Sequence, residues 1–294
     1  MSKYIITTES NSEIPFEWED QNDFGVLRMP YTIDDVERFY DLGRETDIPG
    51  FFNRMREGAV VTTAQRNPHE IVEYFEPYLK KGYDILHIAF SSKLSGTFNN
   101  ELIARDELLL KYPERRIEII DTLAISMPLG IIVGKALEMR NSGLSLDDVK
   151  TWVETHKLSA CALFVVDNLE YLRRGGRITN FAAFMGTALQ LKPIITITPD
   201  GFLQPIAKVK GRRKAVKYMI DKCKNTILNP EDQEIYILHA DCEDEALKLR
   251  DMIMEEIKPK DAILRWVGPV IGSHCGPGTL AVVYFAKHRD ELMR

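Results

Sequence analysis

Cysteine is scarce in this chain of 294 residues, and its four copies, Cys161, Cys223, Cys242 and Cys275, stand far apart. No two of them form a C-x-x-C pair. This argues against a disulfide framework and a cysteine-based zinc site, and it favours reduced thiols in the cytoplasm. The six histidines show neither H-x-H nor H-x-x-x-H spacing, so we expect no metal site and no cofactor.

Long apolar runs and blocks of positive charge are missing as well. No run approaches the roughly 20 apolar residues that cross a membrane. The first residues, M-S-K-Y-I-I, lack the apolar core and cleavage site of a signal peptide. The formal net charge is −6, whereas proteins that bind nucleic acids or anionic membranes usually have a basic surface. We expect a soluble cytoplasmic protein with no nucleic-acid partner and no stable membrane insertion.

The length and the order of apolar runs indicate two α/β domains. A chain of 294 residues exceeds the usual size of one core, and we place the domains at 1–157 and 158–294. In the first half, short apolar runs alternate with helical stretches, which is typical of a parallel sheet covered by helices. The predicted strands are 4–8, 25–31, 83–90 and 116–121, and the predicted helices are 68–81, 97–111, 128–141 and 146–156.

The second half favours a mixed α/β domain with antiparallel pairing. Asp200 and Gly201 form a turn signal between the apolar runs 194–198 and 202–209, as in a β-hairpin. Further strands are predicted at 160–166, 234–240, 262–267 and 279–285, and helices at 212–227 and 243–257.

One segment, 178–191, contains no charged residue. Its large apolar side chains, Phe181, Phe184, Met185 and Leu189, are spaced as a helix would space them. A helix this apolar is buried on most sides. It either packs in the core or lines a ligand site, and its periodicity suits both.

The stretch S-S-K-L-S-G-T at 91–97 lies between a predicted strand and a predicted helix. Open N–H groups and the positive end of the dipole at a helix N-terminus favour anions. With the Thr-rich turn at 61–65 and the Gly/His-rich tail at 272–278, this predicts a carboxylate or phosphate held by neutral donors. The simpler alternatives are that Ser95 caps the helix and that Thr62 and Thr63 form a turn or cap.

One nucleotide motif is incomplete, a second is complete but misplaced, and one enzyme alternative stays open. G-I-I-V-G-K at 130–135 is one residue too short for a P-loop, and Ala136 replaces its Ser or Thr. G-P-G-T-L-A at 276–281 lies too near the C-terminus to open a dinucleotide-binding unit. A serine hydrolase built from Ser95, His274 and Asp121 remains possible, although Lys93 stands where a nucleophile elbow needs glycine.

Taken in order, six short motifs resemble the DegV family of proteins nearly end to end. They are T-E-S at 8–10, T-A-Q-R-N-P at 63–68, S-S-K-L-S-G-T at 91–97, D-T-L-A-I-S-M at 121–127, L-R-R-G-G-R-I at 172–178 and I-G-S-H-C-G-P-G at 271–278. Each motif alone is weak evidence. Together, at sensible separations, they indicate a member of this bacterial family, which includes the fatty acid-binding subunits of fatty acid kinase.

This resemblance implies a two-domain fold that buries one long-chain fatty acid in a tunnel between a parallel-sheet domain and a mixed-sheet domain. The family pattern places the carboxylate at the inner end of the tunnel, on Thr63, Ser95, the Gly96 backbone and His274. It also makes the segment 178–191 an acyl-tunnel wall. The protein would perform no chemistry itself, and a kinase subunit would convert the carboxylate to an acyl phosphate for phospholipid metabolism.

The chain departs from the family pattern at several positions near the expected head group. Glu9 replaces Asp and lengthens the reach of that carboxylate, Ala64 removes a hydroxyl, and Arg66 replaces proline. M-P-L at 127–129 departs from a glycine-containing stretch. For kinase docking, we predict a basic surface made by Arg173, Arg212 and Arg213, with a plain solvated face as the alternative.

Overall fold

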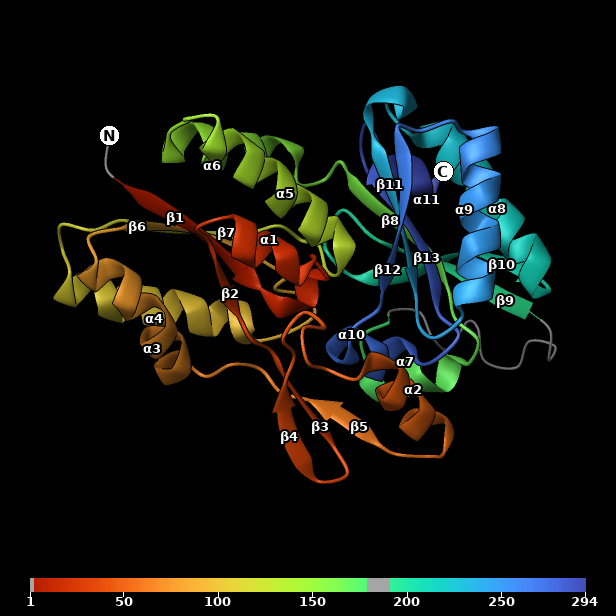
Figure 1. Cartoon of the computed structure of the whole chain (residues 1–294), viewed down its shortest axis with the longest axis horizontal. Coiled ribbons are helices and arrows are strands. Elements are labelled where there is room, and N and C mark those ends of the chain that lie inside the picture. Colours follow the sequence, from red (N-terminus) through yellow and green to blue (C-terminus); the bar gives the residue numbers. More distant parts are fainter. Residues whose placement is uncertain (1–2, 179–190) are drawn as a thin grey trace.

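The computed structural model describes residues 3–178 and 191–294. Figure 1 shows two α/β halves side by side, with a small sheet projecting below them. No described helix is both long enough and apolar enough to cross a membrane.

The first half is built on a parallel sheet in the order β2-β1-β6-β7. Its side chains alternate between two helical layers, since Ile5 packs with α3 and α4 whereas Ile6 faces the rest of the protein. α5 packs on the sheet's second side and against α6. The bounds are β1 (Tyr4–Glu9), α1 (Phe16–Gln21), β2 (Gly25–Leu27), α3 (Pro68–Lys80), β6 (Asp84–Ala89), α4 (Thr97–Lys111), β7 (Ile117–Asp121), α5 (Met127–Asn141) and α6 (Leu146–His156).

Local capping explains why several helices begin where the sequence predicts. Asn67 and Glu70 form a capping box at the start of α3, and Ser145 and Asp148 form one at the start of α6. Such caps satisfy N–H groups that the first helical turn leaves open. The predicted helices at 68–81, 97–111, 128–141 and 146–156 are confirmed to within one residue.

The second half is built on a mixed sheet in the order β10-β9-β8-β13-β11-β12. β11 and β12 are parallel and the other neighbours are antiparallel, which confirms the predicted mixed pairing. α8, α9 and α11 cover one face, and the opposite face turns toward the first half. The bounds are β8 (Ala160–Val165), β9 (Leu191–Ile197), β10 (Leu203–Lys210), α8 (Arg212–Thr226), β11 (Glu234–His239), α9 (Glu243–Glu256), β12 (Asp261–Trp266), β13 (Leu280–Phe285) and α11 (Asp290–Met293).

The small antiparallel sheet, β4-β3-β5, is a feature that sequence reasoning missed. The strand predicted at 25–31 is wrong as one unit, because it divides into β2 and β3 of different sheets. Between them the Met29 N–H donates to Ser10 Oγ (2.9 Å), and Pro30 has no N–H to donate. The predicted Thr62–Thr63 turn is instead part of β5, which pairs with β3. The bounds are β3 (Pro30–Ile33), β4 (Val36–Phe39) and β5 (Val61–Thr63).

Three short helices gather between the small sheet and the second half, namely α2 (Ile48–Arg56), α7 (Leu169–Gly175) and α10 (Pro269–Cys275). α10 packs against α7, α2, β3 and β5. It therefore joins parts of the chain that lie more than 200 residues apart in the sequence.

The two halves share one hydrophobic cluster, which includes Leu86 and Val133 from the first half and Ile195 and Val283 from the second. At its edge lies Arg289, which is fully buried. Its guanidinium donates to the carbonyl oxygens of Ala160 (2.8 Å), Lys157 (3.1 Å) and Leu123. The proposed boundary between 157 and 158 lies between α6 and β8 and therefore beside this junction.

Candidate functional site

A cavity of about 350 Å³ lies between the two halves. Pockets that hold small molecules measure roughly 300–1,000 Å³, so its size suits one ligand. Its wall comes from the inner face of the mixed sheet, from α10, and from the loops that follow β1, β5, β6 and β7. Both halves therefore contribute to a single site.

The deeper wall of the cavity is apolar. The mixed sheet contributes side chains from five strands, and the first half, α10 and the loop before α10 add further apolar groups. The buried lining residues include Ala162, Ile197, Leu238, Ala281, Val283, Met29, Phe90, Val267 and Val270, whereas Phe164, Ile125, Leu203 and Ile271 are half-buried. Such a wall gains free energy by covering an apolar chain and offers no compensation to a buried charge.

The other end of the cavity is polar and centres on Thr63 and His274. Thr63 Oγ1, at the end of β5, shares a hydrogen bond of 2.9 Å with His274 Nε2 on α10. Gly175 makes room for the imidazole, because a Cβ there would lie 2.4 Å from His274 Nδ1. The glycine of the L-R-R-G-G-R-I motif is therefore required by close packing against the tail motif.

Ser95 and Gly96 lie on the same wall, at the start of α4. Ser95 Oγ accepts a hydrogen bond from the Thr97 N–H (3.2 Å) and also bonds to Thr97 Oγ1 (3.1 Å). The N-cap of α4 is Gly96, which makes no side-chain cap bond, so this local bond takes the place of the capping role that we held as the alternative for Ser95. It leaves the side chain on the cavity wall, so Thr63, Ser95, Gly96 and His274 are brought together as the sequence predicts.

His274 is held in its neutral form near pH 7. Burial, with a smaller contribution from the positive charge of Arg177, lowers the pKa of His274 to about 4. A neutral imidazole has one N–H donor and one acceptor nitrogen. It can therefore donate a hydrogen bond to an anion without adding a positive charge.

The geometry does not form the alternative Ser-His-Asp triad. Among the described residues, His274 Nδ1 has no hydrogen-bond partner, whereas a triad needs a carboxylate there. Asp121 Oδ1 instead accepts from the backbone N–H groups of Leu123 (3.0 Å) and Ser92 (3.3 Å). The hydrolase alternative is not supported.

Sequence reasoning missed several residues of the cavity wall, above all Gln65 and Arg177. The Gln65 carboxamide lies over Gly96, where a Cβ would be 2.2 Å from Gln65 Oε1. Arg177 Nε donates to the Leu94 carbonyl (3.3 Å). Its guanidinium places a positive charge on a wall for which the sequence predicted neutral donors, and the L-R-R-G-G-R-I motif was the signal that could have found it.

Asn11 and Ser126 are further polar residues of the wall that the sequence did not single out. Ser126 has φ 59° and ψ −151°, a backbone conformation that is rare for a residue with a side chain. Asn11 is buried, and its Oδ1 has no partner among the described residues. Backbone strain and unpaired buried polar atoms are features that gather at functional sites.

Exposure distinguishes the two ends of the cavity. Ala64, Gln65, Gly96 and Arg177 are exposed and Thr63, Ser95 and His274 are half-buried, whereas the apolar wall is largely buried. A head group on the polar end would therefore lie toward solvent. The inner-end position that the resemblance implied for the carboxylate stays a prediction.

Three groups of predicted residues fall elsewhere. The predicted acyl-tunnel residues, Phe181, Phe184, Met185 and Leu189, lie outside the described residues. Arg66 does not line the cavity; its guanidinium lies over the Phe39 ring (5.0 Å to the centroid) and pairs with Glu70 (3.3 Å). The three docking arginines lie on α7 and α8, outside the cavity wall.

These docking arginines differ from one another. Arg173 is exposed and pairs with Glu170 within α7, and Arg213 is exposed on α8. Arg212 is largely buried, bonds to Glu245 (2.9 Å), and donates to the Gly278 carbonyl (2.6 Å). Arg212 therefore supports the tail motif from within the protein.

Comparison with known proteins agrees with this architecture. Residues 3–287 match the sequence model described as an uncharacterised protein of the DegV family. A DegV domain-containing protein of Clostridium perfringens is 41% identical over 290 residues, covering 99% of this chain and 100% of its own.

Solved structures are similar over the whole length. A fatty acid-binding DegV family protein of Thermus thermophilus superposes with a TM-score of 0.87 at 27% identity, over 97% of this chain and 99% of its own. DegV of Bacillus subtilis, a fatty acid-binding protein, superposes with a TM-score of 0.83 at 26% identity, over 98% of this chain and all of its own.

The lowered pKa of His274 predicts a pH-dependent contribution to stability. Between pH 6.5 and about 4 the unfolded chain takes up a proton at this residue and the folded protein does not, so acid favours unfolding. The wild type should therefore lose more stability than His274→Gln as the pH falls from 7 to 4.5, by an amount on the order of 2 kcal/mol.

Urea unfolding of both proteins across this pH range measures the difference. NMR of the ligand-free protein gives a direct check, in which the His274 ring stays neutral at pH 5. An imidazolium at pH 6, with parallel stability curves for the two proteins, would contradict the prediction.

Proposed function

The chain belongs to the DegV family, and we propose that it binds one long-chain fatty acid in the cavity between its two halves and presents the carboxylate to a fatty acid kinase. DegV-fold proteins bind fatty acids. The observation that carries the proposal is the gradient within one cavity, from an exposed polar end to a buried apolar wall. A fatty acid has the same division between head and tail.

The polar end offers donors suited to a carboxylate. The Thr63 and Ser95 hydroxyls, the Gly96 N–H and the His274 imidazole line it, and Arg177 adds a positive charge. A carboxylate that accepts several good hydrogen bonds stays ionised, and bonds to a charged acceptor are about twice as strong as neutral ones.

The acyl tail supplies most of the binding free energy. Burying about fifteen methylenes at roughly 0.8 kcal/mol each gives a gross gain near 12 kcal/mol. Ordering the chain and losing its translational freedom reduce this gain. A net value of about −8 kcal/mol corresponds to micromolar affinity, so submicromolar binding is within reach.

Presentation, and not catalysis, fits the chemistry of the site. His274 lacks an orienting carboxylate among the described residues, so nothing there prepares it as a general base. The exposed polar end instead leaves a bound carboxylate open to a second protein. The four cysteines are free thiols, which agrees with the cytoplasmic location that we propose.

Native mass spectrometry of protein expressed in bacteria tests the proposal. We expect one long-chain fatty acid per chain, released by organic extraction, and exchange with added palmitate or oleate. An extract without any acyl acid, together with no uptake of either probe, would sink the proposal. If the protein hydrolysed activated esters and Ser95→Ala abolished this activity, the result would support the hydrolase alternative instead.

Two substitutions test the head-group assignment. Ser95→Ala and Thr63→Val each remove a hydroxyl from the polar end, a loss of roughly 1.5–3 kcal/mol for a hydrogen bond to a charged group. Each should weaken palmitate binding about 10- to 100-fold in a fluorescence displacement assay.

Matched controls lie on the surface of the first half. Ser142→Ala and Thr155→Val remove exposed hydroxyls that bond within their own helices, and they should leave affinity unchanged. If all four variants bind alike, the carboxylate lies elsewhere.

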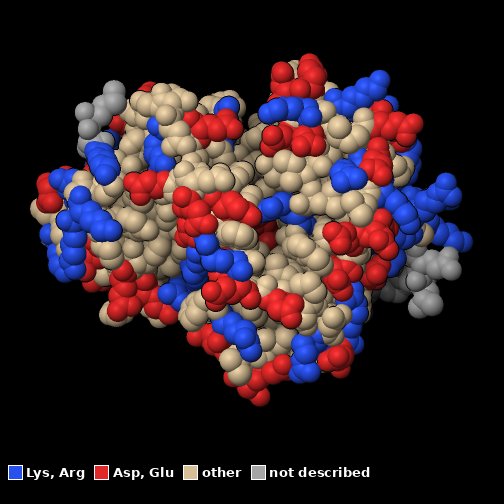
Figure 2. Space-filling view, viewed as in Figure 1, with Lys and Arg blue, Asp and Glu red and all other residues tan. Residues whose placement is uncertain are grey.

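For kinase docking we retain Arg173 and Arg213. Figure 2 shows Lys and Arg side chains gathered at the edge formed by β10 and the start of α8, whereas charges of both signs are mixed over the rest of this face. A basic edge steers an acidic or phosphate-bearing partner. Arg212 is unsuited to this test, because replacing it would leave Glu245 unpaired.

We expect Arg173→Glu/Arg213→Glu to slow kinase-dependent acyl phosphate formation several-fold, more at low salt than at high salt. Palmitate affinity should not change. Arg105→Glu on α4, which reverses a charge away from the cavity, serves as the control. Normal coupling to the kinase with weakened palmitate binding would assign these arginines to the pocket instead.

A further inference from the structure

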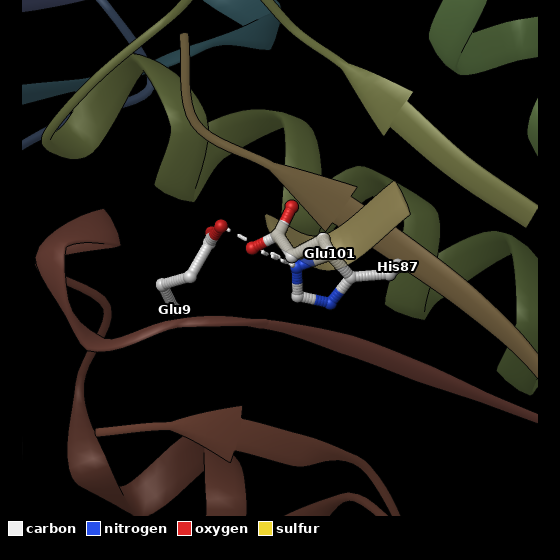
Figure 3. A group of neighbouring side chains, drawn as sticks. All are labelled: Glu9, His87 and Glu101. Atoms are coloured by element: carbon white, nitrogen blue, oxygen red, sulfur yellow. Dashed lines mark hydrogen bonds and ion pairs between the residues drawn. The ribbon is translucent and has the colours of Figure 1, made fainter. Parts of the chain in front are cut away.

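Three ionisable side chains meet inside the first half, away from the cavity wall (Figure 3). Glu9 ends β1, His87 lies in β6, and Glu101 lies on α4. Each is fully buried. His87 Nε2 lies 3.3 Å from Glu9 Oε1 and 3.2 Å from Glu101 Oε1.

The charge of this cluster is not balanced by other side chains. Among the described residues, no Lys or Arg forms an ion pair with either carboxylate. Besides its contact with His87, Glu9 accepts long hydrogen bonds from the Phe90 N–H (3.3 and 3.4 Å), and Glu101 Oε2 is buried with no described partner. Even a protonated His87 would balance one carboxylate of two, and an uncompensated buried charge is costly.

The second ring nitrogen of His87 is already engaged. Its Nδ1 shares a hydrogen bond of 2.8 Å with Thr7 Oγ1. When Nδ1 donates to this oxygen, Nε2 presents its lone pair to the two carboxylates. Metal-binding histidines are held in this way, with the outer N–H donated to a neighbouring oxygen.

The distances from His87 Nε2 to the two carboxylate oxygens also fit coordination of a metal ion better than direct hydrogen bonds. Hydrogen bonds between charged nitrogen and carboxylate groups are about 2.7–2.9 Å long. Ligand atoms that surround a tetrahedral ion at about 2.0–2.1 Å lie roughly 3.3 Å apart. The observed separations of 3.2 and 3.3 Å are close to the second value.

We propose that Glu9, His87 and Glu101 bind one divalent transition-metal ion, with Zn²⁺ as the ion that tetrahedral geometry favours. Two carboxylates, a neutral imidazole and a doubly charged cation sum to zero formal charge. Imidazole and carboxylate are ordinary ligands of Zn²⁺ and Mn²⁺. Glu101 Oε2 is a free oxygen that can complete the set.

The ion would have a structural role next to the fatty acid site. It ties β1, β6 and α4 together. β6 leads into the loop of Ser91 and Ser95, and Glu101 lies one turn after Thr97, where α4 begins. The site therefore anchors both ends of the loop that carries Ser95 and Gly96.

The proposed site contradicts our expectation, drawn from the histidine spacing, that the protein has no metal site. Spacing rules recognise ligands on one local motif, whereas these three come from separate elements. Position 9 is also where the chain departs from the T-D-S pattern, and the longer Glu side chain extends the reach of the carboxylate toward His87.

A shared proton is the competing arrangement. Burial, and then the charge of Glu101, raise the pKa of Glu9 to about 8. Although burial opposes it, Glu101 and Glu9 raise the pKa of His87 to about 10. In the absence of an ion, a neutral Glu9 beside a charged His87 would balance the cluster.

Metal analysis of the full chain separates the two arrangements. Protein without a histidine tag, expressed in medium containing Zn²⁺ and Mn²⁺ and dialysed, should retain about one ion per chain by inductively coupled plasma mass spectrometry. After refolding with a chelator, added Zn²⁺ should raise Tm by roughly 5 °C at a free concentration 100-fold above Kd.

Variants locate the ion. His87→Gln and Glu101→Gln should lose the bound metal, and Thr7→Val, which removes only the outer hydrogen bond, should weaken Zn²⁺ binding about 10- to 100-fold. Glu9→Asp keeps the charge and follows the T-D-S pattern, so it should fold and bind Zn²⁺ more weakly. His288→Gln disrupts a surface pair with Asp290 and should retain full metal content.

Two results would overturn the proposal. Wild-type protein that holds no metal and gains no stability from Zn²⁺ or Mn²⁺ after refolding would assign the cluster to a shared proton. Equal metal content in the wild type and in folded Glu101→Gln would place the ion elsewhere. The wild-type measurement does not depend on the variants. The proposal can therefore be tested even if a variant fails to fold.

Discussion

The hydrophobic cluster shared by the two halves is the constraint on which the rest of the structure depends. Strands of both sheets alternate their side chains, and α5 packs on β1 and β6 of the first sheet as well as on β8 and β13 of the mixed sheet, so the inner faces of both sheets belong to one core. Separating the halves would expose both faces at about 25 cal/mol for each Å² of apolar surface. The cavity is an interruption within this shared core, and its wall is apolar for that reason.

Polar contacts at the edge of the shared core set the register between the halves. Arg289 donates to carbonyls on both sides of the proposed boundary. Glu13, at the opposite end of the chain, accepts from the Gly268 N–H (2.9 Å) at the start of α10, and burial raises the pKa of this carboxyl to about 8. α10 carries His274, so these contacts position the imidazole against Thr63.

Local signals explain how much of the fold could be predicted. The capping boxes of α3 and α6 each lie within four consecutive residues. The strands β1, β6 and β7 are apolar runs bounded by polar turns. The strand expected at 25–31 failed because Ser10, far back in the sequence, takes the Met29 N–H. β5 escaped notice because three residues of Val and Thr gain strand geometry only by pairing with β3.

The sequence by itself determined the α/β class, the order of helices and strands, and the motifs that supply Thr63, Ser95 and His274. Helix caps, apolar periodicity and short motifs each involve only a few neighbouring residues, so they can be recognised in the sequence. Only the tertiary structure decided that the polar end faces solvent, that Arg177 joins it, and that Glu9, His87 and Glu101 meet. Those relations depend on long-range packing, because 211 residues separate Thr63 from His274 and 78 separate Glu9 from His87.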